Sequence, residues 1–430
     1  MTAGVLTQVR SYDRSVQLLL LNQFTINLGF YMLMPFLAQH LSGRLALTGW
    51  LVGLILGMRN FSQQGMFLLG GTLADRFGYK PLIVAGCVLR TVAFAALGLV
   101  DSVPGLLAAS AATGFAGALF NPAVRAYLAQ GAGERRVEAF ALFNIFYQAG
   151  ILAGPLIGLA LTRVDFKLTC LVSAAVFAVL TVVQVRALPQ ARGDSGGSGG
   201  KRESIGRQWR QVLANRPFLL FAASMTGSYV LSFQVYLALP MALRDAAPDE
   251  TAATIGTSTL FAVSGLATIL GQTRVTAWCR RNWTSDRAIT VGLALMGAAF
   301  LPLLMPVPAA GPGRLIGAMA PAVLCGLLLA VATMVIYPFE MDTIVTLAQE
   351  RLVATHYGLY NTICGVGITA GNLLTGAALD ASGRIGLPAL PWLSLTALGL
   401  ACAGAIHLLS CRGSLAAAPK SPAASLAGRS

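Results

Sequence analysis

Six charged residues interrupt runs of apolar residues that are otherwise long enough to cross a bilayer as helices: Arg59, Arg90, Arg125, Arg274, Glu340 and Asp342. A charge in hydrocarbon is costly, so such a residue faces a water-filled cavity or a partner inside the protein. Arg59 and Arg90 lie deep in their runs, and they either pair within the N-terminal part of the chain or line a cavity. The other four lie near one end of their runs, where we expect interfacial or gating salt bridges.

Metal, nucleotide and enzymatic chemistry have little support in the sequence. The seven cysteines are scattered without C-x-x-C spacing, and the three histidines are far apart, so no metal site or cofactor is predicted. The stretch Gly199-Gly200-Lys201 resembles a phosphate-binding loop, but Arg202 stands where a Mg²⁺-binding Ser or Thr is required. A membrane enzyme would need a cluster of His, Asp, Glu or Cys at one face, which the sequence does not show.

The composition is that of an integral membrane protein. The chain has 430 residues, of which 56% are hydrophobic and 11% charged. Soluble domains carry roughly 25% charged residues. The net charge is +14, but the basic residues are dispersed over short loops. This pattern favours orientation in a membrane and not nucleic-acid binding.

Twelve apolar runs divide into two groups of six. The sequence therefore predicts an all-α membrane protein with a six-helix bundle at 1–188, a Gly-rich basic linker at 189–216, a second bundle at 217–411 and a disordered tail at 412–430. A short helix is expected around Trp209. Most Lys and Arg residues fall in the segments that would be cytoplasmic if both termini were inside, which predicts that orientation.

The two groups of six also resemble each other. Asn144, Gly150 and Gly154 match Asn361, Gly367 and Gly371 with a nearly constant offset. Parallel repeats of this kind build one class of transporter, in which the substrate site lies between the halves near the bilayer midplane. Arg125 and Asp342 occupy equivalent repeat positions, and we predict an ion pair between them.

One turn between two apolar runs carries a recognisable spacing. In the stretch Gly71-Thr72-Leu73-Ala74-Asp75-Arg76-Phe77-Gly78-Tyr79-Lys80, Gly78 permits the positive φ of a tight turn, and Arg76 and Lys80 mark a cytoplasmic face. The spacing resembles the signature between spans two and three of the major facilitator superfamily. That resemblance implies that Asp75 and Arg76 latch the two halves in one state. The alternative is a merely solvated turn.

The run Gly150-Ile151-Leu152-Ala153-Gly154-Pro155-Leu156-Ile157-Gly158 has glycines four residues apart, which lets another helix approach closely. Pro155 bends the helix. The run resembles the span-five signature of the drug:proton antiporter branch of the same superfamily, and the whole chain from Gln17 to Leu409 resembles the MdtH-type multidrug exporter group. The resemblance implies that these glycines and Pro155 prevent leak. Ordinary helix packing is the alternative.

The sequence departs from that branch in its first span. Relatives often place an acid there, whereas this span offers polar but non-titrating residues such as Asn22 and Asn27. If a proton is coupled to transport, it must be carried by Glu340 or Asp342, or by an acid at the end of a span such as Asp101. Coupling to protons could also be absent.

Polar and aromatic residues of the spans could line a cavity suited to amphipathic ligands of varied shape. The candidates are Asn27, Tyr31, Gln63, Gln64, Asn144, Tyr147, Gln148, Tyr229, Gln234, Tyr236, Asn361 and Asn372. Each of them could instead make a hydrogen bond between helices.

These observations predict a monomeric secondary transporter in the cell membrane that exports lipophilic or amphipathic small molecules, with the proton as coupling ion and membrane lipid as its surroundings. A dedicated carrier of a metabolite or natural product is the alternative within the same fold. A polytopic membrane enzyme is the alternative of a different class. The sequence itself does not name the cargo.

Overall fold

The computed structural model describes residues 3–162, 164–189, 204–247, 249–305, 314–413 and 415. Within these ranges the regular elements are α-helices and short 3₁₀ turns, and there is no strand. The predicted glycine-rich part of the linker and most of the predicted tail lie outside the described residues. The helix expected around Trp209 is present as α8 (Ile205–Ala214).

Six long helices make up the N-terminal bundle, after the short α1 (Ala3–Arg10): α2 (Arg14–Gly43), α3 (Gly49–Phe77), α4 (Tyr79–Leu99), α5 (Val103–Ala132), α6 (Arg136–Thr162) and α7 (Phe166–Ala187). The C-terminal bundle contains α9 (Arg216–Phe233), α10 (Ala238–Ala246), α11 (Glu250–Asn282), α12 (Ser285–Ala298), α13 (Arg314–Leu347), α14 (Val353–Ile385) and α15 (Leu390–Cys411). The 3₁₀ turn η1 (Gly133–Arg135) joins α5 to α6, and η4 (Leu301–Leu304) follows α12.

The number of membrane spans follows from helix length and hydropathy. Among the described residues, ten stretches are long and apolar enough to cross a membrane, and one of them, Val103–Thr162, covers both α5 and α6. α3 is not among the ten, because the polar run from Arg59 to Gln64 lowers its mean hydropathy, but its 29 residues suffice to cross a bilayer. Counting α3 and separating α5 from α6 gives the predicted twelve.

The seventh span differs from the continuous helix expected at 217–243. The 3₁₀ turn η3 (Gln234–Tyr236) separates α9 from α10, and Leu237 leaves the helical conformation with φ −123° and ψ −76°. Breaks of this kind within a span are tolerated where the backbone is enclosed by protein or faces a cavity. Here the side chain of Gln234, fully buried, donates back to the carbonyl oxygen of Val230.

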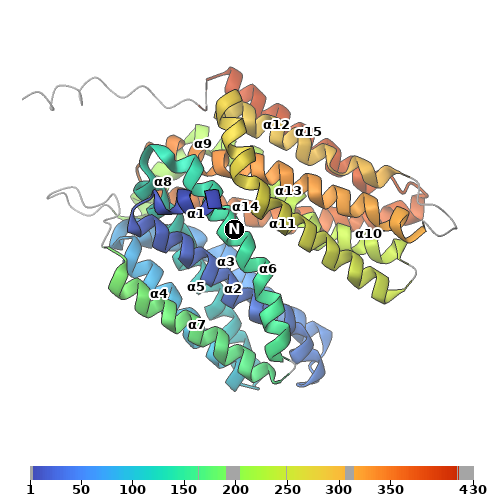
Figure 1. Ribbon diagram of the computed structural model, residues 1–430, viewed down its shortest axis with the longest axis horizontal. Coiled ribbons are helices and arrows are strands. Elements are labelled where there is room, and N and C mark those ends of the chain that lie inside the picture. Colours follow the sequence, from blue (N-terminus) through green and yellow to red (C-terminus); the bar gives the residue numbers. More distant parts are fainter. Residues whose placement is uncertain are drawn as a thin grey trace, which may run out of the picture.

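The two bundles are packed in the same way. In the N-terminal bundle α2 packs on α6, α3 on α5 and α4 on α7, while in the C-terminal bundle α9 packs on α14, α11 on α13 and α12 on α15. These are the equivalent pairs when the spans of each half are numbered from its start. Figure 1 shows the two bundles as a blue-to-green group and a yellow-to-red group of helices. The repeat seen in the sequence is therefore also a repeat of packing.

The bundles contact each other through α3 against α14 and α6 against α11. Along α3, close contacts with α14 run from Gly71, beside Ala354, to Gln64, beside Gly365. We call the end of the molecule that carries the Gly78 turn, η1 and α8 the linker end, and the opposite end the far end. The contact between α3 and α14 lies on the linker-end side.

Towards the far end the same faces of α3 and α14 are uncovered. Gly57 lies two helical turns before Gln64, and Gly53 lies one turn before Gly57, so both are on the face of α3 that contacts α14. Nothing lies within 4 Å of a Cβ built on either glycine. Gly376 on α14 is open in the same way. The two helices therefore run against each other in one half of their length and separate in the other.

Glycines inside the bundles allow close helix contacts, and Gly114 on α5 is one of the sharpest cases. A Cβ there would lie 2.1 Å from the carbonyl oxygen of Arg59, so the substitution Gly114→Ala must push α5 away from α3. Overpacking of this kind costs about 1–3 kcal/mol, and we expect a lower midpoint of thermal unfolding in detergent. The matched control is Gly65→Ala on α3, where nothing lies within 4 Å. Equal stability of the two variants would contradict this packing.

Candidate functional site

The carboxylate of Asp75 joins the two bundles at the linker end. It stands in the last turn of α3 and is 1% exposed. Its Oδ1 accepts a hydrogen bond from the backbone N–H of Ala354 (3.1 Å), and its Oδ2 accepts from the backbone N–H and the hydroxyl of Thr355 (both 2.7 Å). The first N–H groups of a helix have no partner within it, and the helix dipole favours a negative charge there. Asp75 thus caps α14, a helix of the other bundle.

Two glycines of the same motif make this contact possible. A Cβ on Gly71 would lie 2.1 Å from the carbonyl oxygen of Ala354, so α3 can approach α14 this closely only with glycine at that position. Gly78 ends α3 and begins α4 with φ of 92°, a conformation that favours glycine. Its N–H donates to the carbonyl oxygen of Ala74 (2.9 Å).

The two basic residues of the motif have different surroundings. The ammonium group of Lys80 donates to the carbonyl oxygen of Val185 (2.8 Å) and so ties α4 to the end of α7. The guanidinium of Arg76 lies 5.9 Å from the ring centre of Phe77. In the described part of the chain Arg76 makes no ion pair, so of the two residues expected to latch the halves, Asp75 alone contacts the other bundle through an ionised group.

A second connection between the bundles starts from the first residue of α6. Arg136 donates from Nε to Asp342 (2.7 Å) and from Nη1 to Glu350 (2.9 Å). The predicted ion pair between Arg125 and Asp342 is therefore wrong for this structure, since Arg125 instead donates to the amide oxygen of Asn361 (2.9 Å). The repeat symmetry placed Asp342 correctly at the interface but misassigned its partner, because Arg136 starts the following helix and reaches the same carboxylate.

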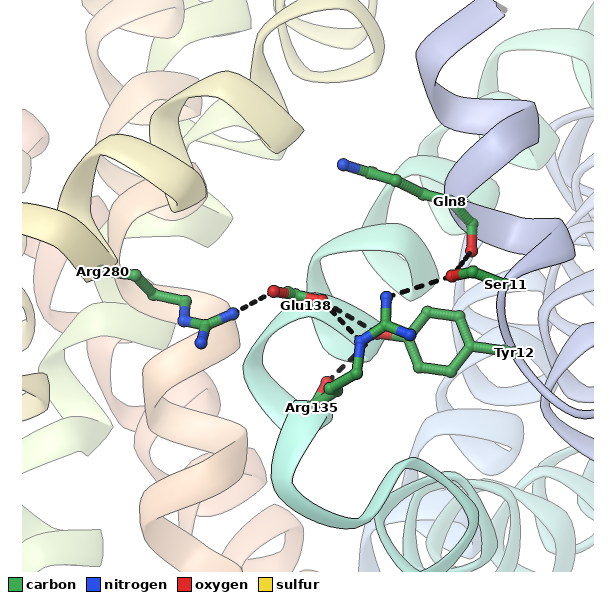
Figure 2. A network of polar contacts seen from close by, with 6 residues as sticks. All are labelled: Gln8, Ser11, Tyr12, Arg135, Glu138 and Arg280. Carbon is green, nitrogen blue, oxygen red and sulfur yellow. Dashed lines mark hydrogen bonds and ion pairs between the residues drawn. The ribbon is translucent and has the colours of Figure 1, made fainter.

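A third connection is shown in Figure 2, where Glu138 lies between basic residues of both bundles. It pairs with Arg280 of α11 and accepts from Nε of Arg135 (2.9 Å). Arg135 also donates to the hydroxyl of Ser11 (3.1 Å), and the hydroxyl of Tyr12 donates to the carbonyl oxygen of Arg135 (3.2 Å). Burial raises the pKa of Tyr12 to about 12, so this hydroxyl remains a donor at physiological pH. The segment after α1 thereby joins the network.

The three connections differ in strength because they differ in exposure. Glu138 and Arg280 are 39% and 41% exposed, and ion pairs this open to water contribute at most about 1 kcal/mol. Arg136 and Asp342 are each 20% exposed, and Asp75 is buried. Hydrogen bonds to charged groups that are shielded from water contribute about 1.5–3 kcal/mol each. Asp75 and the Arg136–Asp342 pair thus dominate the closure of the linker end.

The span-five glycines face the first span. On Gly150, Gly154 and Gly158 a Cβ would lie 2.6, 2.7 and 2.1 Å from the nearest atoms of α2. Pro155 stands among them inside α6. This arrangement packs α6 tightly on α2 within the N-terminal bundle, next to the α6 positions that contact α11.

Glu340 lies in the buried centre of the C-terminal bundle. It is 3% exposed, and its Oε1 accepts from the hydroxyl of Tyr360 (2.6 Å). Tyr229 and Arg125 are close enough to this carboxyl group to interact with it electrostatically. The gating salt bridge expected for Glu340 near the membrane surface is therefore wrong, because in the described part of the chain this acid has hydroxyl partners and no ion pair.

Tyrosine hydroxyls continue from this acid to the N-terminal bundle. Tyr337 on α13 lies close enough to Arg125 on α5 to interact with it electrostatically. Tyr31 on α2 interacts with the hydroxyls of Tyr147 on α6 and Tyr236 in η3. Both bundles thus contribute to one band of aromatic residues with polar tips across the middle of the molecule.

Besides Asn361, the predicted cavity residues Asn144 and Gln64 connect the bundles through hydrogen bonds. The side chain of Asn144, 4% exposed, donates to the amide oxygen of Gln272 on α11 (2.8 Å). The backbone carbonyl of Gln64 accepts from the hydroxyl of Thr362 on α14 (3.1 Å), while its own side-chain oxygen is buried without a partner in the described chain. For Asn144 the role seen is a hydrogen bond between helices.

Other predicted cavity residues make their hydrogen bonds within their own bundle. Asn27 donates to the carbonyl oxygen of Gln23 (2.7 Å), and Gln234 donates to Asn372 (3.4 Å). Gln148 on α6 is partly exposed. These residues shape the walls between the bundles without forming one cluster.

Arg59 and Arg90 lie on the N-terminal side and share one aromatic ring. Their guanidinium carbons are 5.1 and 5.2 Å from the ring centre of Phe30. Arg59 is partly exposed and donates to Gln63 (3.4 Å). Arg90 is 3% exposed and donates to the carbonyl oxygen of Thr113 (2.9 Å). The sequence left open whether these arginines pair within the N-terminal half or line a cavity. In the described residues neither arginine pairs with an acid.

A separate groove of about 520 Å³ lies on the uncovered face of α3 and is apolar: Trp50, Gly53, Leu54, Gly57, Met58 and Phe61. All six residues come from one helix, and the indole N–H of Trp50 is their single polar side-chain group, so the groove has few means to orient a ligand. We therefore place the candidate site at the band of tyrosines and arginines between the bundles.

Metal chemistry finds no site in the described residues, which contain no group of three His, Cys, Asp or Glu side chains able to hold an ion. The seven cysteines are free thiols. The expectation that the protein binds no metal and no cofactor stays a prediction.

Sequence reasoning missed Arg136, Thr355 and Tyr360 as members of the site. Thr355 lies in the first turn of a predicted span, where backbone N–H groups have no partner within the helix, so it could have been found as a donor to an acid. Arg136 and Tyr360 gave no such signal, because their partners Asp342 and Glu340 lie 206 and 20 positions away.

Comparison with known proteins assigns the chain to a family. Residues 19–372 match the model of the Major Facilitator Superfamily. An uncharacterized MFS-type transporter of Mycobacterium tuberculosis is 51% identical over 400 residues, which cover 93% of this chain and 94% of that protein.

More distant relatives carry a functional name. The multidrug resistance protein MdtH of Klebsiella pneumoniae is 28% identical over 91% of this chain and 93% of its own length, and that of Shigella dysenteriae is 25% identical over 89% and 90%. These relatives are transporters or resistance proteins and not enzymes, and the predicted all-α membrane fold is confirmed. The chain belongs to the major facilitator superfamily and is a multi-pass membrane transporter.

Proposed function

We propose that this transporter exports lipophilic or amphipathic small molecules in exchange for protons, by alternating access between its two bundles. The observation that carries the proposal is the buried Glu340, which sits at the end of the tyrosine band that both bundles line. The names of the MdtH relatives support multidrug export. The span-five glycines support it by their resemblance to antiporters.

The conformation supports alternating access. Asp75 and the Arg136–Asp342 pair hold the linker end closed, while Gly53 on α3 and Gly376 on α14 are uncovered at the far end. Glycines on facing helices allow backbones to approach closely. Closure of the far end would bring these uncovered faces together once the linker-end contacts are released. The structure thus corresponds to the state that is closed at the linker end.

The proton is assigned to Glu340. A carboxyl group can take up and release a proton, whereas the amides of the first span cannot. Asp342 is already engaged by Arg136, and Asp101 is exposed between α4 and α5. Arg125 lies near Glu340 and comes from the other bundle, so a change of charge on Glu340 alters the attraction between the bundles. This links protonation to the movement that alternates access.

The cargo would bind among the tyrosines that line the band. Aromatic rings offer large apolar contact surface, and their hydroxyl groups adapt to ligands of varied polarity. The basic residues at the linker end, such as Lys80 and Arg76, favour a cytoplasmic linker end with both termini inside, in the plasma membrane. We expect a monomer, with an N-terminal bundle at 1–188, a linker at 189–216 and a C-terminal bundle at 217–411. A dedicated metabolite carrier remains the second candidate.

The capping role of Asp75 predicts the exchange behaviour of two backbone amides. In Asp75→Asn the charge at the start of α14 is lost, and a hydrogen bond to a charged group contributes about 1.5–3 kcal/mol. Since 1.4 kcal/mol is tenfold in an equilibrium, we expect hydrogen exchange at Ala354 and Thr355 to accelerate about 10-fold to 100-fold, measured by mass spectrometry. Asp165→Asn, at the start of α7, is the control that leaves these amides unchanged. Unchanged exchange in Asp75→Asn would contradict the proposed cap.

The proton assignment is tested by dye efflux from energised cells or everted vesicles, with and without an uncoupler. Glu340→Gln cannot exchange a proton, so we expect loss of uncoupler-sensitive efflux, while movement of dye down its own gradient continues. Asp342→Asn is the matched variant on the same helix. Because it removes only the pair with Arg136, its remaining efflux should still respond to the uncoupler.

Three outcomes separate the candidates. Uncoupler-sensitive efflux that survives in Glu340→Gln, or in the Glu340→Gln/Asp342→Asn double variant, would move the proton elsewhere. Efflux that never responds to the uncoupler would remove proton coupling. Absence of transport over a broad panel of lipophilic dyes would favour the dedicated metabolite carrier.

A further inference from the structure

The N-terminal bundle carries two positive charges in its interior that form no ion pair with an acid in the described part of the chain. Arg59 and Arg90 lie in the middle parts of α3 and α4 and face the same ring of Phe30. All acids of this bundle stand at helix ends or between helices: Asp13, Asp75, Asp101, Glu134, Glu138 and Asp165. Glu340 belongs to the C-terminal bundle. It interacts with Arg125 across the bundle interface and with Tyr229 and Tyr360 of its own bundle.

The surroundings of Arg90 stabilise it as a permanent charge inside the protein. Its guanidinium carbon lies 4.8 Å from the ring centre of Phe120 and 5.5 Å from that of Phe177, in addition to Phe30. Cation–π contacts are attractive and become stronger when they are shielded from water. Its Nε is buried and has no hydrogen-bond partner in the described chain. An unbalanced charge is therefore retained next to the site.

Arg59 presents the accessible part of this charge. Among the described residues its hydrogen-bond acceptors are two neutral amides, those of Asn60 and Gln63. A guanidinium has five N–H donors in a rigid fork that matches a carboxylate, sulfonate or phosphate group. Arg59 is partly exposed and interacts with Tyr31, a member of the tyrosine band. Its free donors are thus within reach of a molecule bound in that band.

We infer that Arg59, with Arg90 behind Phe30, binds the anionic group of the cargo, which is an amphipathic anion such as a lipophilic carboxylate. This inference rests on the proposed export function and names its substrate class. The cost of holding two unpaired charges in the bundle is offset when the anion binds, because the pair then forms in a site of low dielectric. A permanent cation that lacks an anionic group is disfavoured by the same two charges.

The apolar part of the cargo has surfaces to occupy next to Arg59. Phe30 and Tyr31 lie edge to face with ring centres 5.2 Å apart, directly beside the guanidinium. The same chemistry could come from a transported solute or from the head group of an anionic membrane lipid. Both would place an anionic group on Arg59.

The test uses the full chain in nanodiscs of phosphatidylcholine and two probes, a dansylated long-chain carboxylic acid and its primary amide. The probes share the fluorophore and the chain, so their affinities differ only through the anionic group. We expect the acid to bind about 10-fold to 100-fold more tightly, the range of one or two hydrogen bonds to a charged group. Equal affinities would overturn the inference.

Three variants locate the preference. Arg59→Gln should abolish it. Gln63→Glu should also abolish the preference for the acid, because it places a carboxylate where Arg59 already donates. This variant keeps the arginine and its hydrogen bond, so the fold is retained. Arg44→Gln is the matched control, since Arg44 is exposed at the far end and paired with Asp165. Preference for the acid that persists in both Arg59→Gln and Gln63→Glu would overturn the assignment to Arg59.

The source of the anion is identified by repeating the titration with phosphatidylglycerol in the nanodiscs and by native mass spectrometry. A lipid occupant predicts that phosphatidylglycerol is retained by the wild type, is lost in Arg59→Gln and weakens binding of the acid. A transported solute predicts no retention and efflux of the acid. Failure of the anion site leaves the proposed function standing, because uncoupler-sensitive efflux of neutral dyes by the wild type tests export without using the anion site.

Discussion

The buried carboxylate of Asp75 is the contact on which the closed linker end depends. A carboxylate out of water costs several kcal/mol unless its oxygens are satisfied. Here the donors come from Ala354 and Thr355, at the start of a helix in the other bundle. Contact between the two bundles therefore supplies three hydrogen bonds to this charge. A movement that opens the linker end must hydrate or reposition Asp75. The contact therefore adds to the free energy needed for opening but can be broken.

Close packing and charge act together along α3. Gly71 on α3, with Gly358 and Gly365 on α14, lets the two helices lie directly on each other. The polar run from Arg59 to Gln64 follows where they begin to separate. The same helix thus carries the latch, the interface and the cation that we assign to cargo binding. A molecule bound at Arg59 lies between the part of α3 that is held and the part that is open, so its binding can influence both ends.

Composition and repeats predicted the all-α fold and its twelve spans, because membrane insertion demands long apolar helices and parallel repeats leave a constant offset. The motif around Asp75 was predicted through a local turn signal. The partners of Arg125, Asp342 and Glu340 were not, since they depend on how helices far apart in sequence meet. Arg136 reaches Asp342 over 206 positions, and no local pattern records that distance. The break at η3 also left no clear signal in an otherwise apolar run.

The most direct test of alternating access is a pair of distances in the same protein, measured by pulsed electron paramagnetic resonance. One spin-label pair is placed at Gly53 and Gly376, on the uncovered faces of the far end, and the other at Glu134 and Arg281 at the linker end. When a transported dye is added across an imposed pH gradient, the account predicts that the far-end distance shortens as the linker-end distance lengthens. Two distances that stay unchanged, or that change in the same direction, would contradict it.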